Sequence, residues 1–470
     1  MKVIKNYLYN ASYQVFVLLV PLITTPYLAR VLGPKGVGIN SFTNSVIQYF
    51  ILFGSIGVNL YGNRQIAFVR DNKDLLTKTF YEIFFMRLTT ILLSCLSFEI
   101  FLLFVNKYQI FYLAQSVSII AAAFDISWFF MGVENFAVTV LRNFIVKIIT
   151  LTSIFLFVKS YNDLSMYILI LSLSLLLGNL TLFPSLKRYI GKPSLSSLNI
   201  WRHLWPSLVL FIPQIATQVY LVLNKTMLGL MNSVQASGYF DQSDKMIKMV
   251  LAIVTATGTV MLPHVANAFA KGQHEKTKSY LYTSFSFVTA VSVPMSFGLA
   301  AVAPKFVPLF FTSKFNNVIP IMIIESAVIL LIAWSNAIGT QYLLPTKQTN
   351  SYTFSVVIGA IVNLVANIPL ILVLGAVGAA IATVLSELSV TIYQLWVIRK
   401  QVSYRMLFND TFKYLLSGII MFVIVTFFDR WLSQEWIFLI FEVVIGIVVY
   451  VAFLFAFRVK ILKKAKYLFK

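Results

Sequence analysis

Fourteen apolar stretches, each long enough to cross a membrane as a helix, dominate this 470-residue chain and restrict what it can fold into. A membrane-spanning helix needs about 20 mostly apolar residues, and inside lipid only helices or closed barrels satisfy the backbone polar groups. The stretches lie near residues 10–30, 41–61, 82–104, 111–131, 140–158, 165–185, 205–230, 246–268, 281–303, 318–343, 353–373, 376–397, 412–429 and 436–457. We therefore predict an all-α polytopic membrane protein with about 14 transmembrane helices.

The composition agrees with this class. Hydrophobic residues make up 59% of the chain and charged residues only 11%, whereas soluble proteins carry roughly 25% charged residues. The single cysteine, Cys95, lies in an apolar stretch and gives neither a disulfide framework nor a metal-ligand spacing. The first stretch contains polar Gln14 and lacks a convincing cleavage site, so we interpret it as a retained helix and not a signal peptide.

The formal net charge of +21 is typical of nucleic-acid binders, but the positions of the basic residues indicate a different cause. Lysine and arginine favour alternate connecting segments, with 26 on one side and seven on the other. Short cytoplasmic loops are enriched in these residues. The pattern predicts that both termini face the cytosol, and it explains the basic excess by topology and anionic lipids, with no nucleic-acid partner.

The longest polar interruption, residues 187–203, predicts a cytoplasmic linker. It separates an N-lobe of six helices, residues 1–186, from a C-lobe of six helices, residues 204–400, and residues 401–470 add two helices and a basic cytoplasmic tail. A proline-interrupted helix followed by a cation and Leu-Gly occurs in residues 21–38 and again in residues 213–238. Unless this similarity is due to chance, it predicts two pseudo-symmetric lobes.

Basic residues inside or at the ends of apolar stretches are the first candidate site residues, because a charge in hydrocarbon usually faces a cavity or a partner. They are Arg30, Arg87, Lys225, Lys245 and Lys248. Facing one cavity, they would form an anion site that binds phosphate through charge-assisted hydrogen bonds. The alternative, which applies most to Arg30 and Lys245, is that the side chains reach to the membrane surface.

Acidic residues inside the stretches form the second candidate set. Asp125, Glu325 and Glu387 are predicted either to couple transport to an ion or to pair with the cations. The pairs Asp71/Asp74 and Asp241/Asp244 are predicted to cap helix starts. Neither a nucleotide-binding loop nor a hydrolase motif occurs in the sequence, so we expect no enzymatic activity, no cofactor and no metal.

Four segments resemble the Wzx-like polysaccharide or O-antigen repeat-unit flippases of the multidrug/oligosaccharidyl-lipid/polysaccharide (MOP) exporter superfamily. They are residues 25–38 (TPYLARVLGPKGVG), 61–67 (YGNRQIA), 125–136 (DISWFFMGVENF) with Arg142-Asn143, and 374–383 (LGAVGAAIAT). The resemblance extends over essentially the whole chain. It implies a V-shaped pair of six-helix lobes around a cationic cavity that opens alternately to each side of the membrane.

The resemblance also implies the cargo, an undecaprenyl-pyrophosphate-linked oligosaccharide moved across the bacterial cytoplasmic membrane for capsular or exopolysaccharide synthesis. The polysaccharide polymerase machinery is a further expected partner. A pyrophosphate with sugars cannot cross hydrocarbon unaided, and at about 0.8 kcal/mol per buried CH₂ the polyprenyl tail cannot leave it. Arg30 stands inside a matched segment and is the head-group candidate that the resemblance supports most directly.

Two other functions remain open from the sequence. A small-molecule or drug antiporter of the same superfamily would share the fold, although a cation exporter should have an acidic cavity. A membrane-embedded glycosyltransferase or polymerase of the same pathway would need a longer extracytoplasmic segment, and no such segment exceeds about twenty residues.

Overall fold

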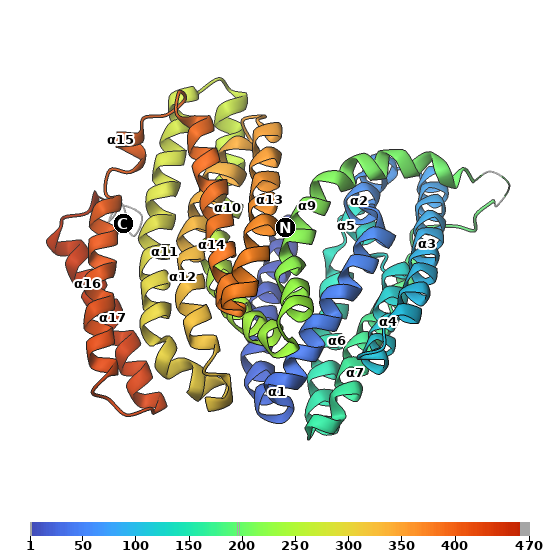
Figure 1. The fold of residues 1–470 in the computed structure, drawn as a ribbon. Helices are drawn as coiled ribbons and strands as arrows, with labels where there is room; N and C mark the ends of the chain where they lie inside the picture. Colours follow the sequence, from blue (N-terminus) through green and yellow to red (C-terminus); the bar gives the residue numbers. More distant parts are fainter. Residues whose placement is uncertain (1, 195, 197, 461–470) are drawn as a thin grey trace. The chain divides into compact units, whose positions relative to one another are not determined.

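The computed structural model describes residues 2–194, 196 and 198–460, without the side chains of residues 2–18 and of some residues in 212–221 and 257–260. Every regular element in this part of the chain is a helix (Figure 1). Eleven of the described helical segments are long and apolar enough to cross a membrane, or twelve if a bent pair within 234–270 forms one span. Large apolar side chains such as Leu103 and Phe104 are exposed, as expected for surfaces that face lipid. The predicted all-α polytopic membrane fold is confirmed.

The chain divides into two compact units, residues 1–226 and 227–470. The boundary between them falls within helix α9 (Leu204–Met231). The predicted lobes 1–186 and 204–400, with their linker and pseudo-symmetry, stay a prediction.

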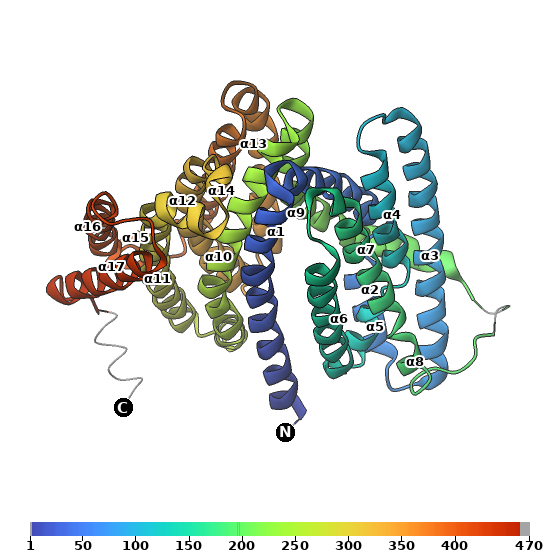
Figure 2. The same ribbon diagram turned by 90° about the horizontal axis from the view of Figure 1, so that it is seen from below.

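In the described part of the N-terminal unit, ten elements precede α9. They are α1 (Lys2–Ser55), α2 (Val58–Val69), α3 (Lys73–Phe104), α4 (Gln109–Ala123), α5 (Ser127–Gly132), α6 (Phe136–Phe157), η1 (Tyr161–Asp163), α7 (Leu164–Leu180), α8 (Phe183–Leu186) and η3 (Ile200–His203). Helices α3, α4 and α7 lie side by side in both views (Figures 1 and 2). Aromatic rings form much of the core around α5, where Trp128 is fully buried and stacks on Phe80 at 5.6 Å between ring centroids.

Helix α1 contains a break between two helices. The Gly- and Pro-containing residues 31–40 are predicted to connect two spans, and Gly33 departs from helical geometry there (φ 65°, ψ 179°), so two helices meet at this residue without an extended loop between them. Glycine adopts this positive φ without strain, and the adjacent Pro34 can begin the second helix because its missing N–H group needs no partner there. Arg30 therefore lies in the last turn of the first of the two helices.

Two of the four family-like segments pack directly on each other. A Cβ atom added at Gly62 in α2 would lie 2.5 Å from the ring of Trp128, and one added at Gly132 would lie 2.6 Å from Ile66. Any larger side chain at either glycine would push α2 and α5 apart. Gly62 and Gly132 thus allow α2 and α5 to pack closely against each other.

The end of the predicted linker is bound to α3 by a buried carboxylate. Glu82 Oε1 accepts a hydrogen bond from the backbone N–H of Asn199 (2.7 Å). Its Oε2 atom lies 2.5 Å from Arg202 Nη2 and 2.9 Å from His203 Nε2, and His203 Nδ1 lies 2.7 Å from the Tyr61 hydroxyl. Because burial disfavours the charged imidazole, the pKa of His203 is lowered from its ordinary value.

We expect Glu82→Gln to loosen this linker. The amide keeps the side-chain shape but loses the charge, and weakening hydrogen bonds to a charged group costs about 1.5–3 kcal/mol. Trypsin should then cleave at Lys187, Arg188 or Lys192 at least roughly tenfold faster. Glu134→Gln is the control, since Glu134 pairs with Arg70 at an exposed site (2.6 Å) where little stability is expected. Equal cleavage rates in both variants would contradict the role of Glu82.

The C-terminal unit contains the remaining helices. They are α10 (Val234–Ala270), α11 (His274–Phe310), η4 (Ser313–Phe315), α12 (Val318–Ser335), the π-helix η5 (Asn336–Leu343), α13 (Thr349–Leu374), α14 (Ala376–Ile398), α15 (Tyr404–Leu407), α16 (Thr411–Asp429) and α17 (Trp436–Ala456). Helix α11 packs against α10, α12, α16 and α17. Its buried Phe285 belongs to a core cluster that also includes Ile329 and Ile338.

A buried charge cluster joins α16 and α17 to α11. Lys305 lies beyond the predicted stretch 281–303, but α11 continues to Phe310, so Lys305 is inside the helix and only 1% exposed. Its ammonium group contacts the buried carboxylate of Glu442 and lies 3.3 Å from Asp429 Oδ1. The sequence assigned no role to Glu442. A buried lysine requires such partners because an isolated charge is costly away from water.

Candidate functional site

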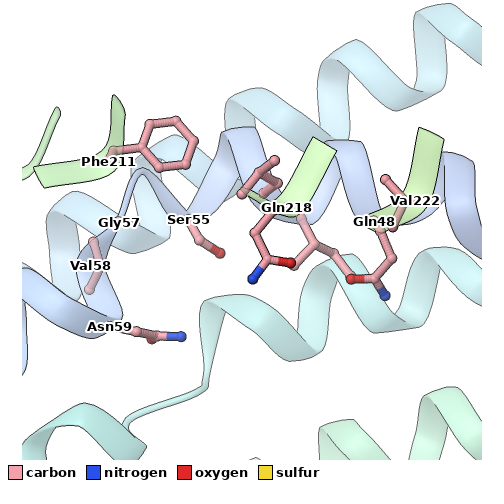
Figure 3. Close-up of a pocket in the computed structure, with 10 residues that line it drawn as sticks. Gln48, Ser55, Gly57, Val58, Asn59, Phe211, Gln218 and Val222 are labelled. Atoms are coloured by element: carbon pink, nitrogen blue, oxygen red, sulfur yellow. The ribbon is translucent and has the colours of Figure 1, made fainter. Parts of the chain in front are cut away.

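A cavity of about 250 Å³, lined by both apolar and uncharged polar residues, lies within the N-terminal unit (Figure 3). Its walls come from α1, the start of α2, and α9. The lining residues are Gln48, Ile51, Leu52, Ser55, Gly57, Val58, Asn59, Phe211, Gln218 and Val222.

Two hydrogen bonds hold α9 against the helices that complete this cavity. Ser207 Oγ donates to the backbone carbonyl of Ile56 (2.5 Å), where α1 gives way to α2. Further along α9, Thr226 Oγ1 donates to Ser45 Oγ in α1 (2.8 Å). Since the cavity-lining residues of α9 lie between these two contacts in sequence, the walls of the cavity are held at both ends.

The polar groups that line the cavity are uncharged. Gln48, Asn59 and Gln218 contribute amides, each with two N–H donors and a carbonyl acceptor, and Ser55 contributes a hydroxyl (Figure 3). This set matches a neutral ligand rich in hydroxyl groups. A search for charged residues does not find these amides, although Gln48 and Gln218 stand out as polar residues within the apolar stretches 41–61 and 205–230.

Arg87 does not line the cavity but donates a hydrogen bond to one of the lining amides, that of Asn59. The side chain is 2% exposed, and Nη1 donates to Asn59 Oδ1 (2.7 Å) and to the backbone carbonyl of Asp125 (2.8 Å). Its Nη2 atom lies 3.6 Å from the Asp125 carboxylate. With both terminal nitrogens directed at protein groups, Arg87 is placed to position Asn59 through the forked geometry of the guanidinium.

Asp125, predicted within the fourth span, lies at the break between α4 and α5. Its Oδ1 atom accepts a hydrogen bond from the backbone N–H of Ser127 (3.0 Å), which begins α5. Asp125 therefore supports the start of α5 and also faces Arg87.

Two of the predicted cations form ion pairs within α10. Lys245 Nζ lies 2.5 Å from Asp241 Oδ2, and Lys248 Nζ lies 2.7 Å from Asp244 Oδ2. The prediction that Asp241 and Asp244 cap a helix start is wrong, because α10 begins at Val234 and its N-cap is Ser233. The pairing lowers the positive charge that these lysines could offer to an anion.

The other predicted residues are distributed over both units. Arg30 is exposed on α1 and donates to the Pro26 carbonyl (2.9 Å), and Lys225 is half-buried on α9. Glu325 on α12 is buried and accepts from Ser243 of α10, and Glu387 is buried on α14. Arg30, Arg87, Asp125 and Lys225 belong to the N-terminal unit, and the other four belong to the C-terminal unit. A common cavity for all of them stays a prediction.

No cluster of metal-ligating side chains occurs among the residues that the structure describes. The described polar groups near the cavity are suited to binding and orienting a ligand.

Comparison with known proteins first defines the class. The fold is similar to the inward closed conformation of the lipid II flippase MurJ, with a TM-score of 0.76 and 19% identity over 97% of this chain and all of that one. It is also similar to an inward-facing multidrug resistance MATE family transporter of the MOP superfamily, with a TM-score of 0.65 and 11% identity over 81% of this chain and 94% of that one. The chain thus has the fold of a polytopic transporter.

The sequence comparison then gives the family. The profile described as "Polysaccharide biosynthesis protein" matches residues 3–269, more than half of the chain, and the protein belongs to this family. A putative O-antigen transporter of Escherichia coli K12 is 24% identical over 84% of this chain and 96% of its own length. The lipopolysaccharide biosynthesis protein WzxC of the same strain is 32% identical over 29% of each chain. The protein is an integral membrane transporter of the flippase type and not an enzyme, and the resemblance found in the sequence is confirmed.

Proposed function

We propose that the protein flips an undecaprenyl-pyrophosphate-linked oligosaccharide from the cytoplasmic to the outer leaflet of a bacterial cytoplasmic membrane, with both termini in the cytosol. The oligosaccharide is a repeat unit for capsular or exopolysaccharide synthesis, and the polymerase machinery takes it up on the outer face. The protein acts by alternating access through a central cavity. Flippase relatives support the transport step, and the amide-lined cavity of the N-terminal unit carries the proposal for sugar recognition.

The cavity suits the sugars of this cargo better than its pyrophosphate. Amide groups donate and accept hydrogen bonds with hydroxyls in many arrangements, and apolar side chains such as Phe211 and Val222 complete the walls. The hydrogen bond from the Arg87 guanidinium to Asn59 Oδ1 keeps this amide in one orientation. In this proposal Arg30 and Lys225 contact the pyrophosphate, and Arg87 is a positioning residue.

The test is to measure lipid-linked oligosaccharide on each membrane face after depletion of the protein and its replacement by variants. Gln48→Ala with Gln218→Ala removes two ligand-facing amides. At about 1 kcal/mol for each lost hydrogen bond, transport at limiting cargo should fall at least roughly tenfold, and intact cargo should accumulate on the cytosolic face. Lys225→Ala should produce the same accumulation.

The matched control is Gln109→Ala, because Gln109 is exposed at the start of α4 and donates only to the Val105 carbonyl (2.6 Å) among the described contacts. It should transport as the wild type does.

Cargo that reaches the outer face but stays unpolymerised would indicate a polymerase instead. Cargo that never forms would indicate a glycosyltransferase, and drug efflux without any cargo defect would indicate an antiporter.

A further inference from the structure

A second cavity, of about 770 Å³, lies within the C-terminal unit and shares no residue with the site described above. It is lined by residues of α11, by α15, by the start of α16, and by Lys460. Helices α11 and α16 both begin here, and α17 ends shortly before Lys460. In Figure 1, α15 lies beside the ends of α11 and α16. Since these helices cross the membrane, their common end places the cavity at the depth of the lipid head groups.

Polar and apolar side chains both line the cavity. Hydroxyl groups of Ser279, Thr283 and Ser286 on α11 contribute to the lining. Met406 of α15 also lines the cavity and is 63% exposed, and Phe412 near the start of α16 is 74% exposed. Exposed apolar side chains beside polar groups at a membrane surface suit a ligand with a polar head and hydrocarbon chains.

Four charged residues line this cavity: Glu275, Asp410, Arg405 and Lys460. Both acids are already engaged, because Glu275 pairs with Lys278 (2.8 Å) and Asp410 pairs with Lys413 (3.1 Å). Asp410 also accepts a hydrogen bond from the backbone N–H of Lys460 (3.1 Å). Within the described part of the chain, the exposed side chains of Arg405 and Lys460 take part in no ion pair. Their positive charges line the cavity without a carboxylate partner.

We propose that this cavity binds the head group of an anionic phospholipid, with its phosphate between the Arg405 guanidinium and the Lys460 ammonium group. The cavity hydroxyls donate to the phosphate or glycerol oxygens, and the acyl chains follow Met406 and Phe412 into the bilayer. Arginine and lysine bind phosphate through short charge-assisted hydrogen bonds. This lipid is separate from the cargo and binds at the surface of the C-terminal unit.

Lipid titration of the purified full-length protein tests the proposal. The unfolding midpoint is followed in neutral detergent as phosphatidylglycerol, or phosphatidylcholine with the same acyl chains, is added. Phosphatidylglycerol should raise the midpoint, and phosphatidylcholine should not. Each basic residue near an anionic lipid contributes about fivefold in binding. The combined Arg405→Gln and Lys460→Gln variant should therefore bind phosphatidylglycerol roughly 25-fold more weakly.

Lys400→Gln is the matched control, because Lys400 is an exposed cation just after α14 and does not line the cavity. It should bind phosphatidylglycerol as the wild type does. The proposal is overturned if phosphatidylcholine raises the midpoint equally, or if the double variant binds as tightly as wild type. An equal shift with inorganic phosphate alone would also overturn it, because the ligand would then be free phosphate.

Discussion

Arg87→Ala should destabilise the protein by about 3–5 kcal/mol, because it leaves a cavity in place of a buried side chain and two acceptors without their donor. The substitution leaves the Asp125 carbonyl and the Asn59 amide oxygen without their donor. Transport per folded molecule should also fall by at least roughly tenfold, because Asn59 then has no fixed orientation in the cavity. Thermal unfolding of the purified variant and the leaflet assay measure the two effects separately.

Asp125→Asn provides the comparison that identifies the cause. It keeps the backbone carbonyl and a side-chain oxygen that can accept from Ser127, and it removes only a partly exposed carboxylate 3.6 Å from the guanidinium. Because Arg87 is buried, loss of this counter-charge should still cost about 3 kcal/mol of stability. If Asp125→Asn lowers transport per folded molecule as much as Arg87→Ala does, the ion pair dominates and the positioning role of Arg87 is wrong. Arg87→Lys should be intermediate, since an ammonium group cannot bridge both acceptors with the same fork.

Lys305→Met should be the other strongly destabilising change, again by about 3–5 kcal/mol. It leaves the buried Glu442 carboxylate beside Asp429 without the cation that joins α16 and α17 to α11. The helical pair should then separate more readily from α11. Faster proteolysis in residues 399–410, together with a lower unfolding midpoint, would show this.

The double variant Lys305→Met with Glu442→Met is the matched test. Replacing both charges by apolar side chains of similar length removes the unpaired carboxylate, and most of the lost stability should return. Lys314→Met should have little effect, because Lys314 is exposed in η4. If the double variant is no more stable than Lys305→Met, the helices are held by packing and not by this ion pair.

Some site residues were detectable in the sequence only as charges. Arg87 was selected because a charge within an apolar stretch requires a partner or a cavity, but its partner Asn59 lies 28 positions away and carries no charge. Lys245 and Lys248 were selected by the same rule, and their neighbours Asp241 and Asp244 were misinterpreted because the start of α10 was placed too late. Spacing of four residues along a helix would have indicated both pairs.

The sequence by itself determined that this is an all-helical membrane protein and gave its family, because hydrophobic stretch length and local motifs are properties of neighbouring residues. Only the tertiary structure decided that two helices meet directly at Gly33 and that Gly62 packs on Trp128. It alone brought Gln48, Asn59 and Gln218 to one cavity, and Lys305 to Glu442. The physical reason is that such contacts depend on which helix faces meet, and in lipid nearly every face is apolar, so the hydrophobic pattern does not encode the pairing.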